Sequence, residues 1–259
     1  MLGFILSKMQ MLVFAAGIAV VALLFYDFVS RIGLAESANT LLISNSKIVS
    51  DQINNDLFCS DKFTTLPNVL TYGFSNEAFP YELEFSKQSF GSGDTIENLL
   101  ILRIIEHKSG SAKKNIIAAE SVSSDAEFIL VDTNFISETS PLEKSYNDGK
   151  NTEISLYPRA ASKGAQASSP DAFVALKEVK KGKKTVYIIP CATEKEPNNC
   201  VRNILRVGCL LLKLDGKTNN DDLVPSCFNK STQASVDYDK SRNYTWADCK
   251  SLFTEVTGS

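Results

Sequence analysis

The sequence predicts an α+β protein in which a long N-terminal helix precedes an antiparallel, sandwich-like and disulfide-bonded β-rich head. Three observations predict this class: an uncharged apolar run at residues 9–26, short strand-like runs from residue 81 onward, and six cysteines that all follow residue 58. The 259 residues are enough to bury a sizeable core. We divide the chain into a short leader at residues 1–8, a helix at residues 9–57 and a head at residues 58–259.

The charge of the chain argues against nucleic-acid binding and against complete disorder. The formal net charge is −3, and the first 56 residues contribute three basic and four acidic side chains to it. Neither part therefore has the basic excess that nucleic-acid-binding proteins use to displace counterions from phosphates. Apolar runs recur through the rest of the chain, which a fully disordered protein lacks. We expect a folded protein with no nucleic-acid partner.

Residues 9–26 have the composition of a membrane-spanning helix. Nearly every residue is apolar, and the length is close to that needed to cross about 30 Å of hydrocarbon. Lys8 precedes this run and Asp27 and Arg31 follow it, so the positive-inside tendency places the leader in the cytoplasm and the head outside. A cleaved signal peptide is the alternative, although its apolar region usually has about 7–15 residues. We expect residues 9–28 to span a membrane or to form the core of a helix bundle.

The helix is predicted to continue beyond the apolar run as an amphipathic helix at residues 29–57. The first proline is Pro67, and apolar residues recur at helical spacing at Ile32, Leu34, Ala38, Leu41, Leu42, Val49, Ile53 and Leu57. The polar residues of this stretch fall mostly on other faces, at Glu36, Asn39, Asn45, Ser46, Asp51 and Asn55. Gly33 is the expected position of a kink. We therefore expect one face of this half of the helix to dock under the head.

The cysteines predict disulfides in an exported domain. They are Cys59, Cys191, Cys200, Cys209, Cys227 and Cys249. An even number on an exported domain favours up to three bridges, and the absence of any C-x2-C pair argues against a zinc site. The polar loop between Cys191 and Cys200 suits a bridge between these two residues, although other pairings remain open. The same region contains two glycosylation sequons, at Asn229 and Asn243.

The head is predicted to be built from short, closely spaced strands. Runs of alternating or dense apolar residues lie at 81–88, 99–107, 115–120, 127–132, 152–157, 172–179 and 184–189. The last two flank a lysine-rich turn at residues 180–183 and are typical of a hairpin. Close spacing favours an antiparallel sheet or sandwich over repeated βαβ units. Residues 203–214 fit a strand or a short buried helix, and residues 246–253 fit one or two helical turns.

The sequence contains no pattern that predicts an enzyme. The single histidine, His107, ends an apolar run beside a turn, and no serine lies in a G-x-S-x-G motif. The DGKT segment at residues 215–218 lacks the first glycine of a phosphate-binding loop, because Leu211 stands there. Residues 215–222 are rich in oxygen ligands but fit an acidic turn better than an EF-hand. The lysines of the hairpin, Lys180, Lys181, Lys183 and Lys184, fit a solvated tip. We expect no cofactor, no metal and no small-molecule substrate.

The N-terminal architecture resembles that of archaeal type IV pilins and pilin-like proteins. The likeness rests on a basic leader, an apolar helix, its amphipathic continuation and a β-rich head with cysteines, and it covers about the first 57 residues. In that family a prepilin peptidase removes the leader. Lys8, Met9 and Gln10 occupy the corresponding place, which implies a cut between Met9 and Gln10, with Met9 standing where glycine or alanine is usual. The resemblance further implies filament or homo-oligomer contacts through residues 9–57.

Two functions follow from these observations. The first is a structural or assembly role, as a pilin-like subunit of an extracellular filament whose helices pack together and whose heads form the outer surface. The second is a single-pass membrane protein whose disulfide-bonded head, on the cell surface, binds a protein, a glycan or an envelope component. Both place residues 58–259 outside the cell.

Overall fold

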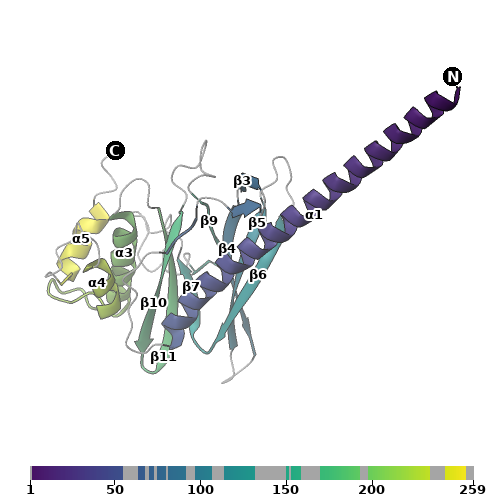
Figure 1. Ribbon diagram of the computed structural model, residues 1–259. Coiled ribbons are helices and arrows are strands. Elements are labelled where there is room, and N and C mark those ends of the chain that lie inside the picture. Colours follow the sequence, from purple (N-terminus) through teal and green to yellow (C-terminus); the bar gives the residue numbers. More distant parts are fainter. Residues whose placement is uncertain are drawn as a thin grey trace.

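In the part of the chain that the structure describes, one very long helix precedes two main sheets, a small two-stranded sheet and three short helices, which is an α+β arrangement (Figure 1). The computed structural model describes residues 2–54, 64–67, 70–72, 75–79, 81–91, 97–106, 114–131, 150–151, 153–158, 170–192, 198–233 and 243–254. This confirms the predicted fold class at the level of a long N-terminal helix followed by a β-rich head.

Along the chain, the long helix comes first, the strands follow, and three short helices come last; we call α3, α4 and α5 together the helical cap. The helix α1 spans Leu2–Asn54. The strands are β1 (Thr64–Thr65), β2 (Leu70–Tyr72), β3 (Ser75–Phe79), β4 (Tyr81–Phe90), β5 (Glu97–Glu106), β6 (Asn115–Ser124), β7 (Glu127–Val131), β8 (Lys150–Asn151), β9 (Glu153–Leu156), β10 (Ala172–Lys180) and β11 (Lys183–Cys191). The C-terminal helices are α3 (Asn198–Leu214), α4 (Ser226–Gln233) and α5 (Trp246–Thr254).

The strands form two main sheets and a small hairpin. The four-stranded sheet has the order β6-β5-β4-β9 and is antiparallel throughout. The five-stranded sheet has the order β1-β10-β11-β7-β8 and is antiparallel except between β11 and β7, which run parallel. The strands β2 and β3 pair with each other. The predicted preference for antiparallel pairing is therefore confirmed, with one parallel pair that the sequence did not indicate.

The β10–β11 hairpin is the centre of the head. Its two-residue turn consists of Lys181 and Gly182, both with positive φ, at 50° and 79°. This conformation is that of a type I′ turn, whose twist matches the flanking strands. Side chains of the two strands alternate between the two faces of the sheet, and both faces are buried. The dense apolar runs at 172–179 and 184–189 reflect this double burial.

Two hydrophobic cores lie on the two faces of the five-stranded sheet. The first core joins both sheets to α1 and includes Phe85, Phe173 and Ile188. The rings of Phe85 and Phe173 meet edge to face across the two sheets, with centroids 5.1 Å apart. The second core joins the other face of the five-stranded sheet to α3, α4 and α5, through residues such as Tyr187 and Phe228. In Figure 1 these three helices accordingly lie on the side of β10 and β11 away from α1.

The segment at residues 203–214, which fitted either a strand or a helix, is the helix α3. One face of α3 packs against the second core and another against α4. Gly208 permits this close approach, because a Cβ atom at that position would lie 2.5 Å from Cγ1 of Val224 and 3.0 Å from Cβ of Phe228. The helical turns predicted near Trp246 are also confirmed, as α5.

We predict that Gly208→Ala destabilises the head by about 1–3 kcal/mol, since the added methyl group overpacks the α3–α4 contact. Chemical denaturation monitored by the fluorescence of the single tryptophan, Trp246, would measure the loss. The matched control is Gly17→Ala, because a Cβ atom at Gly17 would have no neighbour within 4 Å. Equal stability of the two variants would contradict the assigned contact.

Candidate functional site: the projecting helix

The N-terminal half of α1 projects from the head and exposes apolar side chains on every side. Residues 11 and 13–28 are all exposed, and the exposed fraction of Phe14 reaches 73%. Figure 1 shows this half of the helix leaving the strands and extending away from them. Among the described residues α1 is the one helix long and apolar enough to cross a membrane, judged by length and composition. Such a surface needs lipid or other helices to cover it.

The contact between α1 and the head begins directly after the apolar half of the helix. Asp27 and Arg31 form an ion pair, with Oδ2 and Nε 3.0 Å apart, one helical turn from each other. Tyr26 and Phe28 flank Asp27 and are exposed. Ser30 is the first buried residue, so no spacer separates the apolar half from the head. Aromatic and charged side chains together are typical of a membrane–water boundary.

The second half of α1 docks on the head through a narrow stripe. The helix continues through Gly33 without interruption and contacts β2, β5, β6 and β10. The buried positions of the stripe are Ser30, Leu34, Ala38, Leu42, Asn45, Val49, Gln52 and Ile53. Their spacing of three or four residues keeps them on one face of the helix. The predicted docking of an amphipathic half-helix is therefore confirmed.

Two residues of this half were assigned to the wrong face. Ile32 was expected to face the head, but 51% of it is exposed, and Asn45 was expected on another face, but only 1% of it is exposed. At 3.6 residues per turn Ile32 lies about 120° around the helix axis from Ala38, whereas Asn45 lies only about 20° away. The helical geometry, rather than the polarity of each residue, decides its burial here. Asn55 and Leu57 lie outside the described residues.

The C-terminal end of α1 is capped by a lysine from the sheet. Lys177 of β10 is buried, and its Nζ donates a hydrogen bond to the carbonyl oxygen of Ile53 at 3.4 Å. The last turn of α1 has no basic residue of its own. A cation at this end interacts favourably with the helix dipole and with the free carbonyl groups. Lys177 therefore ties the end of the helix to the five-stranded sheet.

The cysteines of the described part are all disulfide-bonded. Cys191 and Cys200 join the end of β11 to the start of α3, and Cys209 and Cys249 join α3 to α5. Cys227 of α4 is also disulfide-bonded. The predicted bridge between Cys191 and Cys200 is thus confirmed. The remaining candidate, Cys59, lies outside the described residues.

Three further candidates from the sequence are the processing site, the single histidine and the acidic turn at residues 215–222. Lys8, Met9 and Gln10 lie in the helical backbone of α1, and nothing is described of their side chains. His107 lies outside the described residues. The described part of the chain contains no group of histidine, cysteine or acidic residues that could hold a metal ion. Within the acidic turn, a carboxylate oxygen of Asp222 instead accepts the backbone N–H of Asn219 at 2.8 Å.

The lysines of the β10–β11 hairpin do not form a free basic patch. Lys180 pairs with Asp215 at the end of α3. Lys183 pairs with Glu127 at 2.8 Å, and Lys184 approaches Asp125 at 3.7 Å. Three of the four lysines thus have an acidic neighbour, which fits the prediction of a solvated hairpin tip.

A polar pocket lies where β4 and β5 meet β7. Its volume is about 250 Å³, and it is lined by Lys87, Gln88, Ser89, Asn98, Glu127 and Phe128. Several of its polar groups are already satisfied within the protein: Lys87 donates to the carbonyl oxygen of Phe128 at 3.3 Å, and Ser89 donates to Asn98 at 2.8 Å. A pocket this small with polar groups already paired offers little to an organic ligand.

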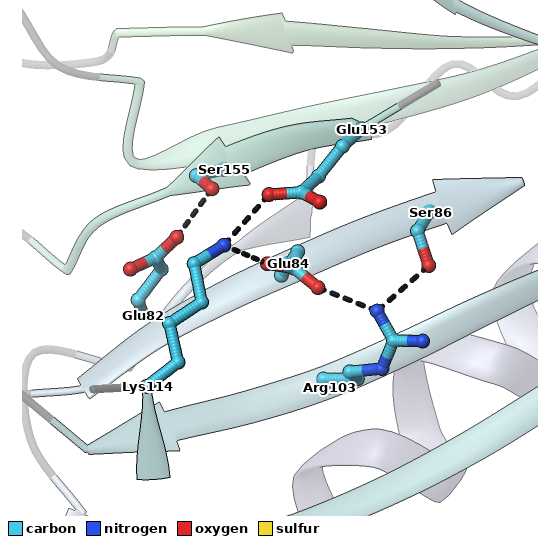
Figure 2. A network of polar contacts seen from close by, with 7 residues as sticks. All are labelled: Glu82, Glu84, Ser86, Arg103, Lys114, Glu153 and Ser155. Atoms are coloured by element: carbon cyan, nitrogen blue, oxygen red, sulfur yellow. Dashed lines mark hydrogen bonds and ion pairs between the residues drawn. The ribbon is translucent and has the colours of Figure 1, made fainter. Parts of the chain in front are cut away.

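A network of ion pairs surrounds the buried Glu84 on the four-stranded sheet, and no pattern in the sequence indicates it (Figure 2). Alternation of the kind seen at residues 81–88 is typical of a strand with one buried and one solvent-exposed face. The acidic residues Glu82 and Glu84 nevertheless have exposed fractions of only 3% and 2%. Glu84 pairs with Arg103, directly opposite on β5, with Oε1 and Nη1 2.7 Å apart. Nζ of Lys114 contacts the other oxygen of Glu84 and lies 2.7 Å from Oε1 of Glu153 on β9.

The network holds its charged groups in place through hydrogen bonds between opposite charges. Burial by itself raises the pKa of Glu84, but hydrogen bonds from Lys114 and Arg103 outweigh it, so that this pKa lies below its ordinary value. Hydrogen bonds to Glu153 and Glu84 raise the pKa of Lys114. At neutral pH the carboxylate of Glu84 and the ammonium group of Lys114 are therefore both ionised and attract each other as an ion pair. The network instead fixes β9 and the start of β6 to β4.

Comparison with known proteins adds no family to this description. No protein-family model matches the chain, and no curated protein or solved structure is significantly similar to it. The function must therefore be argued from the geometry of the helix and the head.

We predict that Glu84→Gln lowers the free energy of unfolding by about 2–3 kcal/mol at pH 7, since hydrogen bonds to a charged group are lost. The pKa of Glu84 is lower in the folded chain than its ordinary value of 4.5, so this contribution is present above pH 4.5 and is lost as the pH falls further. The difference between variant and wild type should therefore shrink in acid. Denaturation curves between neutral pH and pH 3 would measure it. Glu120→Gln, at an exposed position of β6, is the control and should behave as wild type.

We also predict that reduction loosens the helical cap more than the four-stranded sheet. Removing a native bridge typically costs about 2–5 kcal/mol. Both described bridges, Cys191–Cys200 and Cys209–Cys249, have one end in α3, and Cys227 of α4 is also disulfide-bonded. Hydrogen exchange with and without reductant would show faster exchange in residues 198–254 than in β4, β5 and β6. Thiol labelling of the unreduced, denatured protein is the companion measurement. Free thiols at Cys209 and Cys249 would contradict the bridge assigned to them.

Proposed function

We propose that the protein is a pilin-like structural subunit of a cell-surface filament, whose apolar half-helix lies in a membrane before assembly and in the filament core afterwards. One observation carries this proposal. A single uninterrupted helix exposes apolar side chains on every side over residues 13–28 and then becomes part of the head's own core. Any packing of the projecting halves would therefore fix the positions of the heads directly.

A seam of large apolar residues supports contact between helices. Six exposed residues follow one another at alternating spacings of four and three residues: Phe14, Ile18, Val21, Phe25, Phe28 and Ile32. Alternation of three and four is the pattern by which helices pack along a common seam. Lipid accounts for exposed apolar residues before Asp27, but Ile32 lies beyond the Asp27–Arg31 ion pair. Ile43 is also exposed on this side of α1. A second helix alongside would cover both isoleucines.

The disulfides support an extracytoplasmic position of the head. Disulfide bonds persist in oxidising compartments and are rare in the cytosol. The bridges Cys191–Cys200 and Cys209–Cys249 both lie on the C-terminal side of the apolar half-helix. With Lys8 on the other side of that segment, the positive-inside tendency gives the same orientation.

The second candidate is a single-pass membrane-anchored surface protein whose head binds a partner. The all-round exposure of residues 13–28 favours it too, because lipid covers every face of an isolated helix. It differs from the first in needing no contact between copies and no removal of the leader.

We predict that Ile32→Lys prevents filament formation while leaving a folded, disulfide-bonded head in the membrane, since the charge falls on the helix seam outside the hydrocarbon. Negative-stain imaging of sheared surface material and its sedimentation would measure assembly. Ser44→Lys is the matched control, because Ser44 is exposed on α1 but lies off the seam, and this variant should assemble.

The mature N-terminus separates the two candidates further. Mass spectrometry of the purified protein should find Gln10 as the first residue if the leader is removed as proposed. An intact Met1, together with a detergent-solubilised monomer and no filaments, would overturn the filament role in favour of the anchored surface protein.

A further inference from the structure

The two glycosylation sequons lie side by side in the structure but differ in exposure. Asn229 lies in α4 and is buried, with 4% of it exposed, whereas Asn243 lies just before α5 and is exposed. The side-chain oxygen of Asn229 accepts a hydrogen bond from the backbone N–H of Tyr244 at 3.1 Å. The asparagine of the first sequon therefore holds the backbone of the second. Its amide is engaged in the fold, which argues against the predicted attachment of a glycan there.

The second sequon is held rigidly with its asparagine outward. Tyr244 is buried in the second core, and its carbonyl oxygen accepts the backbone N–H of Val224 at 3.0 Å. The backbone N–H and the hydroxyl of Thr245 donate to Oδ2 of Asp248 at 2.9 and 3.3 Å, which caps the N-terminus of α5. Thus every residue around Asn243 on its C-terminal side is anchored, while Asn243 itself is presented to solvent.

We infer that Asn243 is the acceptor of an N-linked glycan and that Asn229 is not. This inference rests on the extracytoplasmic position of the head proposed above. In the transfer, Nδ2 of Asn243 forms a bond to the anomeric carbon of a lipid-phosphate-linked oligosaccharide. The bond from that carbon to the phosphate oxygen breaks, the lipid phosphate leaves with the electron pair, and the amide loses one proton to the transferase. A chain glycosylated at Asn229 before folding could not bury this residue.

The position of Asn243 also keeps a glycan away from the projecting helix. The helices α3, α4 and α5 pack on one face of the five-stranded sheet and α1 packs on the side of the other face, as Figure 1 shows. A glycan beside α5 would therefore coat the outer side of the head and leave the seam of α1 free for helix packing.

The test is intact-protein and glycopeptide mass spectrometry of the full chain purified from its native cells. We expect a glycan on the peptide that contains Asn243 and an unmodified peptide for Asn229. Asn243→Gln should lose the whole glycan mass. The control Ser231→Ala destroys the first sequon without touching Asn229 and should leave the mass of the glycan unchanged.

Failure of this inference is distinguishable from failure of the proposed function. Protease accessibility of the head in intact cells and thiol labelling report the position of the head independently of any glycan. An unmodified Asn243 on an accessible, disulfide-bonded head would overturn the inference and leave the filament role standing. An inaccessible head with free thiols would overturn both, and a glycan on Asn229 would overturn the assignment of the acceptor.

Discussion

The structure depends on one continuous helix, α1, whose first half is exposed and whose second half forms part of the core of the head. The docking stripe of α1, from Leu34 to Ile53, belongs to the same hydrophobic core as the strands of both sheets. Without this half of the helix, the apolar faces of β6 and β10 that it contacts would be exposed to water. The head is therefore not an independent domain to which a helix has been attached. The position of the projecting half therefore fixes the position of the head, because the exposed Phe28 and the buried Ser30 are separated by one residue of the same helix.

The five-stranded sheet connects α1 to the rest of the head, because one face packs on α1 and the other on α3, α4 and α5. Since both faces of β10 and β11 are buried, α1 and the helical cap are held on opposite sides of one sheet. Lys177 fixes the end of α1 on one side, and the bridge Cys191–Cys200 fixes the start of α3 at the end of β11. The cap itself is small, and its disulfides compensate for the limited apolar area that three short helices can bury. The helix α1 and the three short helices are thus each fixed to the same two central strands, β10 and β11.

Much of this architecture could be predicted from the sequence because it depends on local periodicity. The helix α1, the β10–β11 hairpin and the bridge Cys191–Cys200 all follow from residues close together in the chain. The parallel pairing of β7 with β11 and the cap that Lys177 provides join residues far apart, which no local pattern reveals. The burial of Glu84 was missed for another reason. Alternation tells which side chains share a face of a strand but not which face is covered. Arg103 and Lys114, which make that burial tolerable, come from other strands and turns.

The polar atoms in the docking stripe suggest how the boundary between the two environments is set. Oγ of Ser30, Nδ2 of Asn45 and Oε1 of Gln52 are buried without a hydrogen-bond partner in the described part of the chain. Each such group costs about 1–3 kcal/mol, so leucine at these positions would dock more tightly. A fully apolar stripe, however, would leave the two halves of α1 less distinct in hydropathy, and lipid could compete with the head for the second half. Unpaired polar groups are more costly still in hydrocarbon, where no water reaches them. In the membrane-associated roles proposed above, the imperfect docking stripe would therefore restrict the lipid-exposed part of the helix to the residues before Asp27.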